Sequence, residues 1–170
     1  EIAAAHALRG KKSKISAKNF MRRRPRKLAR LRESLQNGTY TTGRHRIFTV
    51  YEPKKRNVFM LPLYPDHIVH HALMNILAPI WQKLFIKDSY ACIPGRGLHT
   101  ASHRCMQMLR RNKYVLQCDI RKFYPSINHE IMMKILRRKI TDKRLLKILE
   151  NIVRSVDTER GMQIRNLRRQ

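Results

Sequence analysis

The sequence predicts an α+β fold, and two observations carry this prediction. Apolar residues recur at helical spacing in several stretches, for example at Leu28, Leu31 and Leu35. Two short β-like runs, at 47–51 and 58–61, flank a turn rich in charge, which is the pattern of a β-hairpin. With 170 residues and a hydrophobic fraction of 42%, the chain can bury a real core in one domain or two small lobes.

The first 39 residues predict a basic helical arm. Residues 2–8 are rich in alanine and helical in character, and 10–14 interrupt them with glycine and charge. A second helix then ends at Asn37-Gly38, since Gly and Asn favour the turn that closes a helix. Because residue 1 is Glu and residues 1–8 resemble the middle of a helix, we expect a piece of a longer protein.

Residues 40–113 predict the hairpin followed by helices. Asp66 can cap a helix whose apolar face runs over 68–77, and Pro79 bends or restarts it. Pro94 to Gly97 form a loop, and Thr100 can cap a helix that runs to about Arg111.

Residues 114–170 begin with a compact apolar strand at 114–120, and a turn ends at Pro125 and Ser126. A helix then carries 131–136, and Thr141 or Asp142 caps another.

Positive charge dominates the composition. The chain has 38 Lys and Arg against 11 Asp and Glu, a net charge of +27 and a pI near 11.2. Such a field attracts polyanions, so nucleic acid is the expected partner. A membrane surface fits less well because the basic residues lie along the whole chain and no run is long enough to span a bilayer. Composition alone favours an RNA-binding protein without chemistry.

The three cysteines, Cys92, Cys105 and Cys118, are odd in number and lack C-x-x-C spacing. A disulfide framework and a structural zinc site are therefore disfavoured, and a reducing, cytoplasmic setting fits. We expect all three to be small, buried, apolar residues.

Asp119 is the residue that points most sharply to chemistry. It stands at the end of the predicted strand, in a chain with few acids, so it should be hydrogen-bonded, paired or bound to metal. A carboxylate at a strand end can hold Mg²⁺ for phosphoryl transfer. A salt bridge from Asp119 to Arg121 or Lys122 explains the same residue without function.

Four segments in order resemble bacterial reverse transcriptases, with the diversity-generating retroelement and group II intron enzymes as the nearest groups. These segments are the hairpin at 52–62, the helix at 66–73, the loop at 88–101 and the motif at 118–129. The resemblance implies a right-hand polymerase, with an N-terminal arm at 1–39, fingers at 40–113 and a partial palm at 114–170. It implies RNA-directed DNA synthesis from an RNA template, a DNA or RNA primer and deoxynucleotides, with Mg²⁺ or Mn²⁺.

The resemblance also implies roles for residues. Asp119 would be the first metal ligand, and the Ile120 carbonyl a second. Tyr124 would exclude ribonucleotides, with Phe123 beside it in the nucleotide site, although core packing is the simpler interpretation of Phe123. Basic residues at the hairpin tip would contact the triphosphate; Arg56 suits bidentate contact, and Lys54 and Lys55 are equally explained as a solvated turn.

Two further observations concern nucleic acid and metal. Gly95, Arg96 and Gly97 lack the phosphate-loop pattern, and we expect backbone contact with the template or a plain turn. His67 and His71 have zinc-helix spacing but no third ligand, so packing or exposure explains them better.

The segment 161–170 departs from the family pattern Gly-x-Pro-Ile-Gly-x-x-x-Ser-Gln. Gln170 keeps the final position, which lies near the template, but Gln163, Arg165 and Arg169 replace proline, glycine and serine. Arg165 cannot mimic glycine where backbone approaches a ligand. The Tyr-x-Asp-Asp motif is expected beyond Gln170.

Two alternatives therefore stay open: a non-catalytic RNA-binding module with the same fold, and a relative that makes DNA without a template. The resemblance to the diversity-generating group also implies a small basic accessory protein as a partner.

Overall fold

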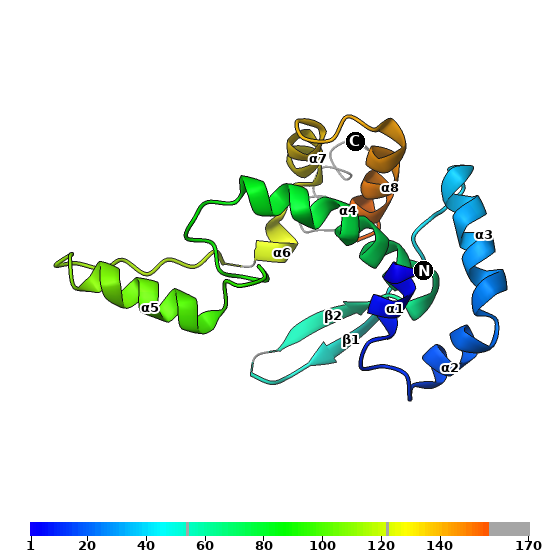
Figure 1. The fold of residues 1–170 in the computed structure, drawn as a ribbon, viewed down its shortest axis with the longest axis horizontal. Helices are drawn as coiled ribbons and strands as arrows, with labels where there is room; N and C mark the ends of the chain where they lie inside the picture. The colour runs from blue at the N-terminus through cyan, green and yellow to red at the C-terminus, as the bar shows by residue number, and fades with distance from the viewer. Residues whose placement is uncertain (54, 122, 157–170) are drawn as a thin grey trace, which may run out of the picture. The chain divides into compact units, whose positions relative to one another are not determined.

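A computed structural model describes residues 1–53, 55–121 and 123–156 of the chain. It is mostly helical and contains one two-stranded antiparallel sheet among the described residues (Figure 1). The chain divides into two compact units. Unit 1 comprises Glu1–Ala72 and the described part of Lys122–Gln170, and unit 2 comprises Leu73–Arg121.

The N-terminal arm contains three helices: α1 (Ile2–Leu8), α2 (Ile15–Arg22) and α3 (Arg24–Gln36). The sequence predicted one helix after the basic break, whereas the structure has two, because Pro25 in the first turn of α3 disfavours a helix running through from α2. Phe20 of α2 is fully buried and stacks on Tyr64 with ring centroids 5.8 Å apart. As predicted, α3 ends at Asn37, and Gly38 follows with a φ of 67°.

The predicted hairpin is present. Strands β1 (Arg46–Val50) and β2 (Arg56–Met60) pair antiparallel, with Arg46 opposite Met60 and Val50 opposite Arg56 (Figure 1). The Thr49 hydroxyl donates to Asn57 Oδ1 at 3.0 Å, so a side-chain bond ties the strands next to the turn. This tie fixes the register at the end of the hairpin that carries the basic turn.

After the hairpin, a short helical turn at Leu63–His67 leads into α4 (Ile68–Leu84), which continues through Pro79. The prediction that Asp66 caps this helix was wrong. Asp66 is fully buried, and its carboxylate accepts from the Tyr40 hydroxyl and the Gly43 amide instead. A buried carboxylate needs such donors, and the chain just before β1 supplies them.

Unit 1 also contains a helical hairpin, formed by α7 (His129–Arg137) packed on α8 (Lys143–Arg154). Asn128 caps α7 and the predicted Asp142 caps α8, each side chain accepting from two backbone amides of the first turn. Met133, which is fully buried, and Leu149 supply apolar contacts in this part of the unit.

Unit 2 contains the second part of α4 and α5 (Leu98–Leu109), for which Gly97 and not Thr100 is the N-terminal cap. The predicted strand at 114–120 was wrong: these residues have no regular secondary structure, are exposed and lie outside any ladder among the described residues. Apolar residues alone do not form a strand, because the backbone groups need a neighbouring strand.

The cysteine prediction was also wrong, since Cys92, Cys105 and Cys118 are all exposed. A small apolar residue is buried only where packed neighbours surround it. All three cysteines lie in unit 2, and within the described residues of that unit Leu73 and Leu77 are the buried apolar side chains. No helix in the described part of the chain is both long and apolar enough to cross a bilayer.

Candidate functional site

Asp119 lies on the exposed segment 114–120 of unit 2, next to Ile120, which is 65% exposed. Its carboxylate is therefore not held in a buried strand end, as the sequence had led us to expect. It is accessible to solvent and to ligands from outside the unit.

Tyr124 and Phe123 belong to α6 (Phe123–Ser126), a four-residue helical turn in unit 1. Their rings meet edge to face with centroids 5.3 Å apart. Tyr124 is 79% exposed and Phe123 is 49% exposed, so the core-packing interpretation of Phe123 was wrong. The pair forms an exposed aromatic surface, which an entering ligand can contact.

The hairpin carries the basic residues proposed for phosphate contact. Lys55 is exposed, and its ammonium lies 5.9 Å from the centroid of the Tyr51 ring. The backbone of Arg56 pairs opposite Val50 and so begins β2, whereas Lys54 lies outside the described residues. The hairpin thus brings Lys55 and Arg56 to one end of the sheet.

A buried polar network connects the base of the hairpin to the helix that follows it. The Tyr40 hydroxyl donates to Asp66 Oδ1 at 2.8 Å, and the Gly43 amide donates to the same oxygen at 3.1 Å. Burial, and then the bond to Asp66, raise the pKa of Tyr40 well above its ordinary value. Gly43 must be small here, because a Cβ would lie 3.0 Å from Asp66 Oδ2.

The sequence did not predict the hydrogen bonds from Tyr40 and Gly43 to Asp66. The available signal was a lone aspartate inside an apolar stretch, after a run of Tyr, Thr and Gly at 40–43. Such an acid is rarely buried without a partner, so its position predicts hydroxyl or backbone amide donors elsewhere in the chain.

A side chain of the loop at 94–97 in unit 2 ties the loop to the chain just before it. The Arg96 guanidinium donates to the carbonyls of Lys87 at 3.1 Å and Ile86 at 3.4 Å. Gly95 has a φ of 75°, and Gly97 leads into α5. Arg96 therefore holds the loop in shape, and the stretch 86–97 presents a defined backbone surface.

An ion pair stands beside this loop. Arg104 Nε donates to Asp88 Oδ1 at 3.0 Å, and the Tyr90 hydroxyl donates to the same atom at 2.9 Å. The hydrogen bond from Arg104, followed by that from Tyr90, lowers the pKa of Asp88. With Arg96 and Lys87, these residues line a cavity of about 360 Å³.

The described residues do not by themselves make a magnesium site. Mg²⁺ prefers several hard oxygen ligands, and Asp119 supplies one carboxylate. Among the described residues, no three His, Cys, Asp or Glu side chains come together as a metal would require. His67 and His71 contact other side chains among the described residues. His67 Nδ1 lies 3.4 Å from Lys11 Nζ, and the His71 ring contacts the His6 ring.

Gln170 and the altered segment 161–170 lie outside the described residues, so the expectation for them stays a prediction.

Comparison with known proteins reveals distant relatives of one kind. The chain is 29% identical to Protein YkfC of Escherichia coli over 140 residues, covering 78% of this chain and 36% of that protein. It is 22% identical to Group II intron-encoded protein LtrA of Lactococcus lactis over 131 residues, covering 76% of this chain and 22% of LtrA. It is 23% identical to Nuclear intron maturase 1, mitochondrial, of Arabidopsis thaliana over 96 residues, which are 56% of this chain and 14% of that protein.

The chain is thus distantly homologous to group II intron maturase and reverse-transcriptase proteins. It spans about a third or less of the length of these relatives, from 14% to 36%. No protein-family model matches it. A specific link to the diversity-generating group, which the sequence motifs had suggested, is not among these relationships.

Proposed function

We propose that the chain forms the fingers and the beginning of the palm of a reverse transcriptase, an RNA-directed DNA polymerase. One observation carries this proposal: the four family-like segments stand in order along a chain whose homology to LtrA extends over 76% of its length. The division at residues 39 and 113 into arm, fingers and palm is part of the proposal.

The proposed reaction is attack of a primer 3′-OH on the α-phosphate of a deoxynucleotide. Asp119 would contribute one carboxylate to a Mg²⁺ or Mn²⁺ ion with the Ile120 carbonyl beside it, and further carboxylates must complete such a site. Arg56 and Lys55, with Lys54, would contact the triphosphate from the hairpin tip. The stretch 95–97 would face the template through its backbone, as would Gln170.

The proposed role of Asp119 is supported by its exposure and tested by primer extension. In the full-length protein, Asp119→Asn should abolish deoxynucleotide incorporation and leave RNA affinity nearly unchanged, because it removes a metal ligand without moving a packed side chain. Glu33→Gln is the matched control, since Glu33 is another exposed carboxylate, located on α3. Incorporation that survives in the Asp119 variant would refute the catalytic assignment.

The sugar-selecting role of Tyr124 has an equally close control. Tyr124 and Tyr114 are 79% and 82% exposed, so replacing either with alanine removes a similar solvent-facing ring. We expect only Tyr124→Ala to raise ribonucleotide incorporation relative to deoxynucleotide incorporation. Unchanged selectivity in that variant would remove Tyr124 from the nucleotide site.

A second candidate is an RNA-binding module of the same fold without polymerase activity. The net charge of +27 and the intron maturases among the relatives favour it. It predicts RNA binding that persists while neither the original protein nor any variant extends a primer.

A further inference from the structure

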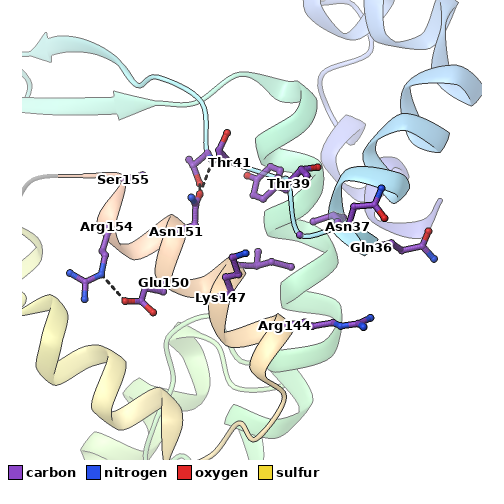
Figure 2. Close-up of a pocket in the computed structure, with 15 residues that line it drawn as sticks. Gln36, Asn37, Thr39, Thr41, Arg144, Lys147, Glu150, Asn151, Arg154 and Ser155 are labelled. Atoms are coloured by element: carbon purple, nitrogen blue, oxygen red, sulfur yellow. Dashed lines mark hydrogen bonds and ion pairs between the residues drawn. The ribbon is translucent and has the colours of Figure 1, made fainter.

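Unit 1 contains a cavity of about 900 Å³ between the chain that leaves α3 and one side of α8 (Figure 2). Residues 35–42 line one side, and residues of α8 from Arg144 to Arg154, with Ser155 just after the helix, line the other. The volume lies within the range of pockets that hold small organic ligands. Of the residues proposed for polymerase chemistry, those that the structure describes lie outside this lining.

The two sides of the cavity are joined by specific contacts. Asn151 Oδ1 accepts from both the amide and the hydroxyl of Thr42, each at 2.7 Å, across 109 positions of sequence. At the other end, Gly38 and Lys147 both belong to the lining. The two hydrogen bonds to Asn151 hold the chain before β1 against α8, so the cavity is formed before any ligand arrives.

The charges of the lining separate into two groups. Arg154 pairs with Glu150 at 2.9 Å and with Glu130 at 2.8 Å, and Glu150 also pairs with Arg137. In Figure 2, Arg154 and Glu150 extend to one side of α8, and Lys147 and Arg144 extend to the other. Within the described chain, Arg144 and Lys147 have no carboxylate within ion-pair distance.

The rest of the lining suits a nucleotide. Hydroxyl and amide groups of Thr39, Thr41 and Asn37 can bond to a sugar or base edge, and Leu35 and Ile148 provide apolar surface for a base. Two cations that have no ion-pair partner among the described residues suit a phosphate. The mixture of apolar, hydrogen-bonding and basic groups matches no purely apolar ligand.

We propose that this cavity binds a nucleotide of single-stranded RNA, with its phosphate at Arg144 and Lys147 and its base or ribose against the 37–41 side. This rests on the RNA-binding part of the proposed function and is independent of polymerase chemistry. Its test therefore needs neither deoxynucleotide nor metal, and it can fail while primer extension succeeds.

The charge test compares two double variants of the full-length protein by fluorescence anisotropy with a labelled single-stranded RNA. Arg144→Gln with Lys147→Gln should weaken binding roughly tenfold. The slope of the logarithm of the binding constant against the logarithm of the salt concentration should become shallower by about 0.7 for each phosphate that is no longer neutralised. Arg138→Gln with Lys139→Gln is the control, because both residues are exposed in the connection between α7 and α8 and lie outside the cavity lining. Equal losses of affinity in the two pairs would overturn the proposal, since they would reflect total charge alone.

A second test leaves the charge unchanged. Thr41→Trp places a large ring at the exposed mouth of the cavity and should weaken RNA binding, whereas Thr141→Trp, outside the lining, should not. Undiminished binding by the Thr41 variant would overturn the proposal. Competition by adenosine monophosphate for the labelled RNA distinguishes a nucleotide within a strand from a free nucleotide. Weak competition supports a nucleotide within a strand. Competition as strong as that of unlabelled RNA would overturn the assignment to a strand.

Discussion

The hydrogen bond between Tyr40 and Asp66 should contribute more to stability than an ordinary tyrosine hydrogen bond. Tyr40 is 8% exposed and Asp66 is fully buried, and their oxygens are 2.8 Å apart. Tyr40→Phe would leave Asp66 Oδ1 with the Gly43 amide at 3.1 Å as its donor. Asp66 Oδ2 already has no partner in the part of the chain that the structure describes.

The magnitude follows from the acceptor. A hydrogen bond to a charged group contributes about 1.5–3 kcal/mol, and one between neutral groups about 0.5–1.5 kcal/mol. Tyr64→Phe is the matched control, because the Tyr64 hydroxyl donates to the neutral carbonyl of Lys27 at 3.1 Å. Both substitutions delete one oxygen and keep the ring, so the difference between them isolates the carboxylate.

The assay is urea unfolding followed by circular dichroism, with thermal melting as a second measurement. Tyr40→Phe should lower the free energy of unfolding by about 1.5–3 kcal/mol with an unchanged m-value. For a chain of this size the melting temperature should fall by about 2–4 °C per kcal/mol. If Tyr40→Phe costs no more than Tyr64→Phe, the buried carboxylate does not strengthen the bond and the reasoning is refuted.

Three further outcomes are expected. Gly43→Ala should destabilise by about 1–3 kcal/mol in urea unfolding, because its Cβ would lie 3.0 Å from Asp66 Oδ2, whereas Gly97→Ala, with open space around it, should be nearly neutral. The pKa of His70 is lowered from 6.5, chiefly by burial, so the unfolded chain binds a proton at His70 more readily than the folded chain does. The free energy of unfolding should therefore fall as the pH drops below about 6.5 and level off below the folded-state pKa. His70→Gln should reduce this pH dependence, as measured by urea unfolding at a series of pH values. Asp142→Ala removes the cap of α8 and should cost about 1 kcal/mol, which thermal melting can measure.

The features that the sequence predicted correctly are local ones. The end of α3 at Asn37-Gly38, the cap of α8 at Asp142 and the hairpin depend on residues within a few positions of one another. A glycine that adopts positive φ, or an aspartate that accepts from amides two and three residues ahead, acts wherever the rest of the chain goes. These features therefore follow from residue type and spacing.

The features that the sequence did not predict depend on distant partners. Thr42 and Asn151 are 109 positions apart, and Tyr40 and Asp66 are 26 apart. An aspartate near a helix start is equally suited to capping and to burial against a distant hydroxyl, and only the fold selects between them. The cavity at α8 could not be anticipated for the same reason, since its two sides come from opposite ends of the chain.

The segment at 114–120 is where local pattern and tertiary pairing disagree most. Tyr114, Val115 and Leu116 are 82%, 68% and 86% exposed, although tyrosine and valine favour strands. Strand propensity reflects packing against neighbouring strands, and in the described residues the one ladder joins β1 and β2. The sequence pattern therefore indicated that 114–120 can pair as a strand, but the described chain contains no strand paired with it. For Asp119 this distinction is decisive, because a carboxylate fixed at the end of a paired strand is positioned for a metal, whereas one on an unpaired segment must be positioned by whatever pairs with that segment.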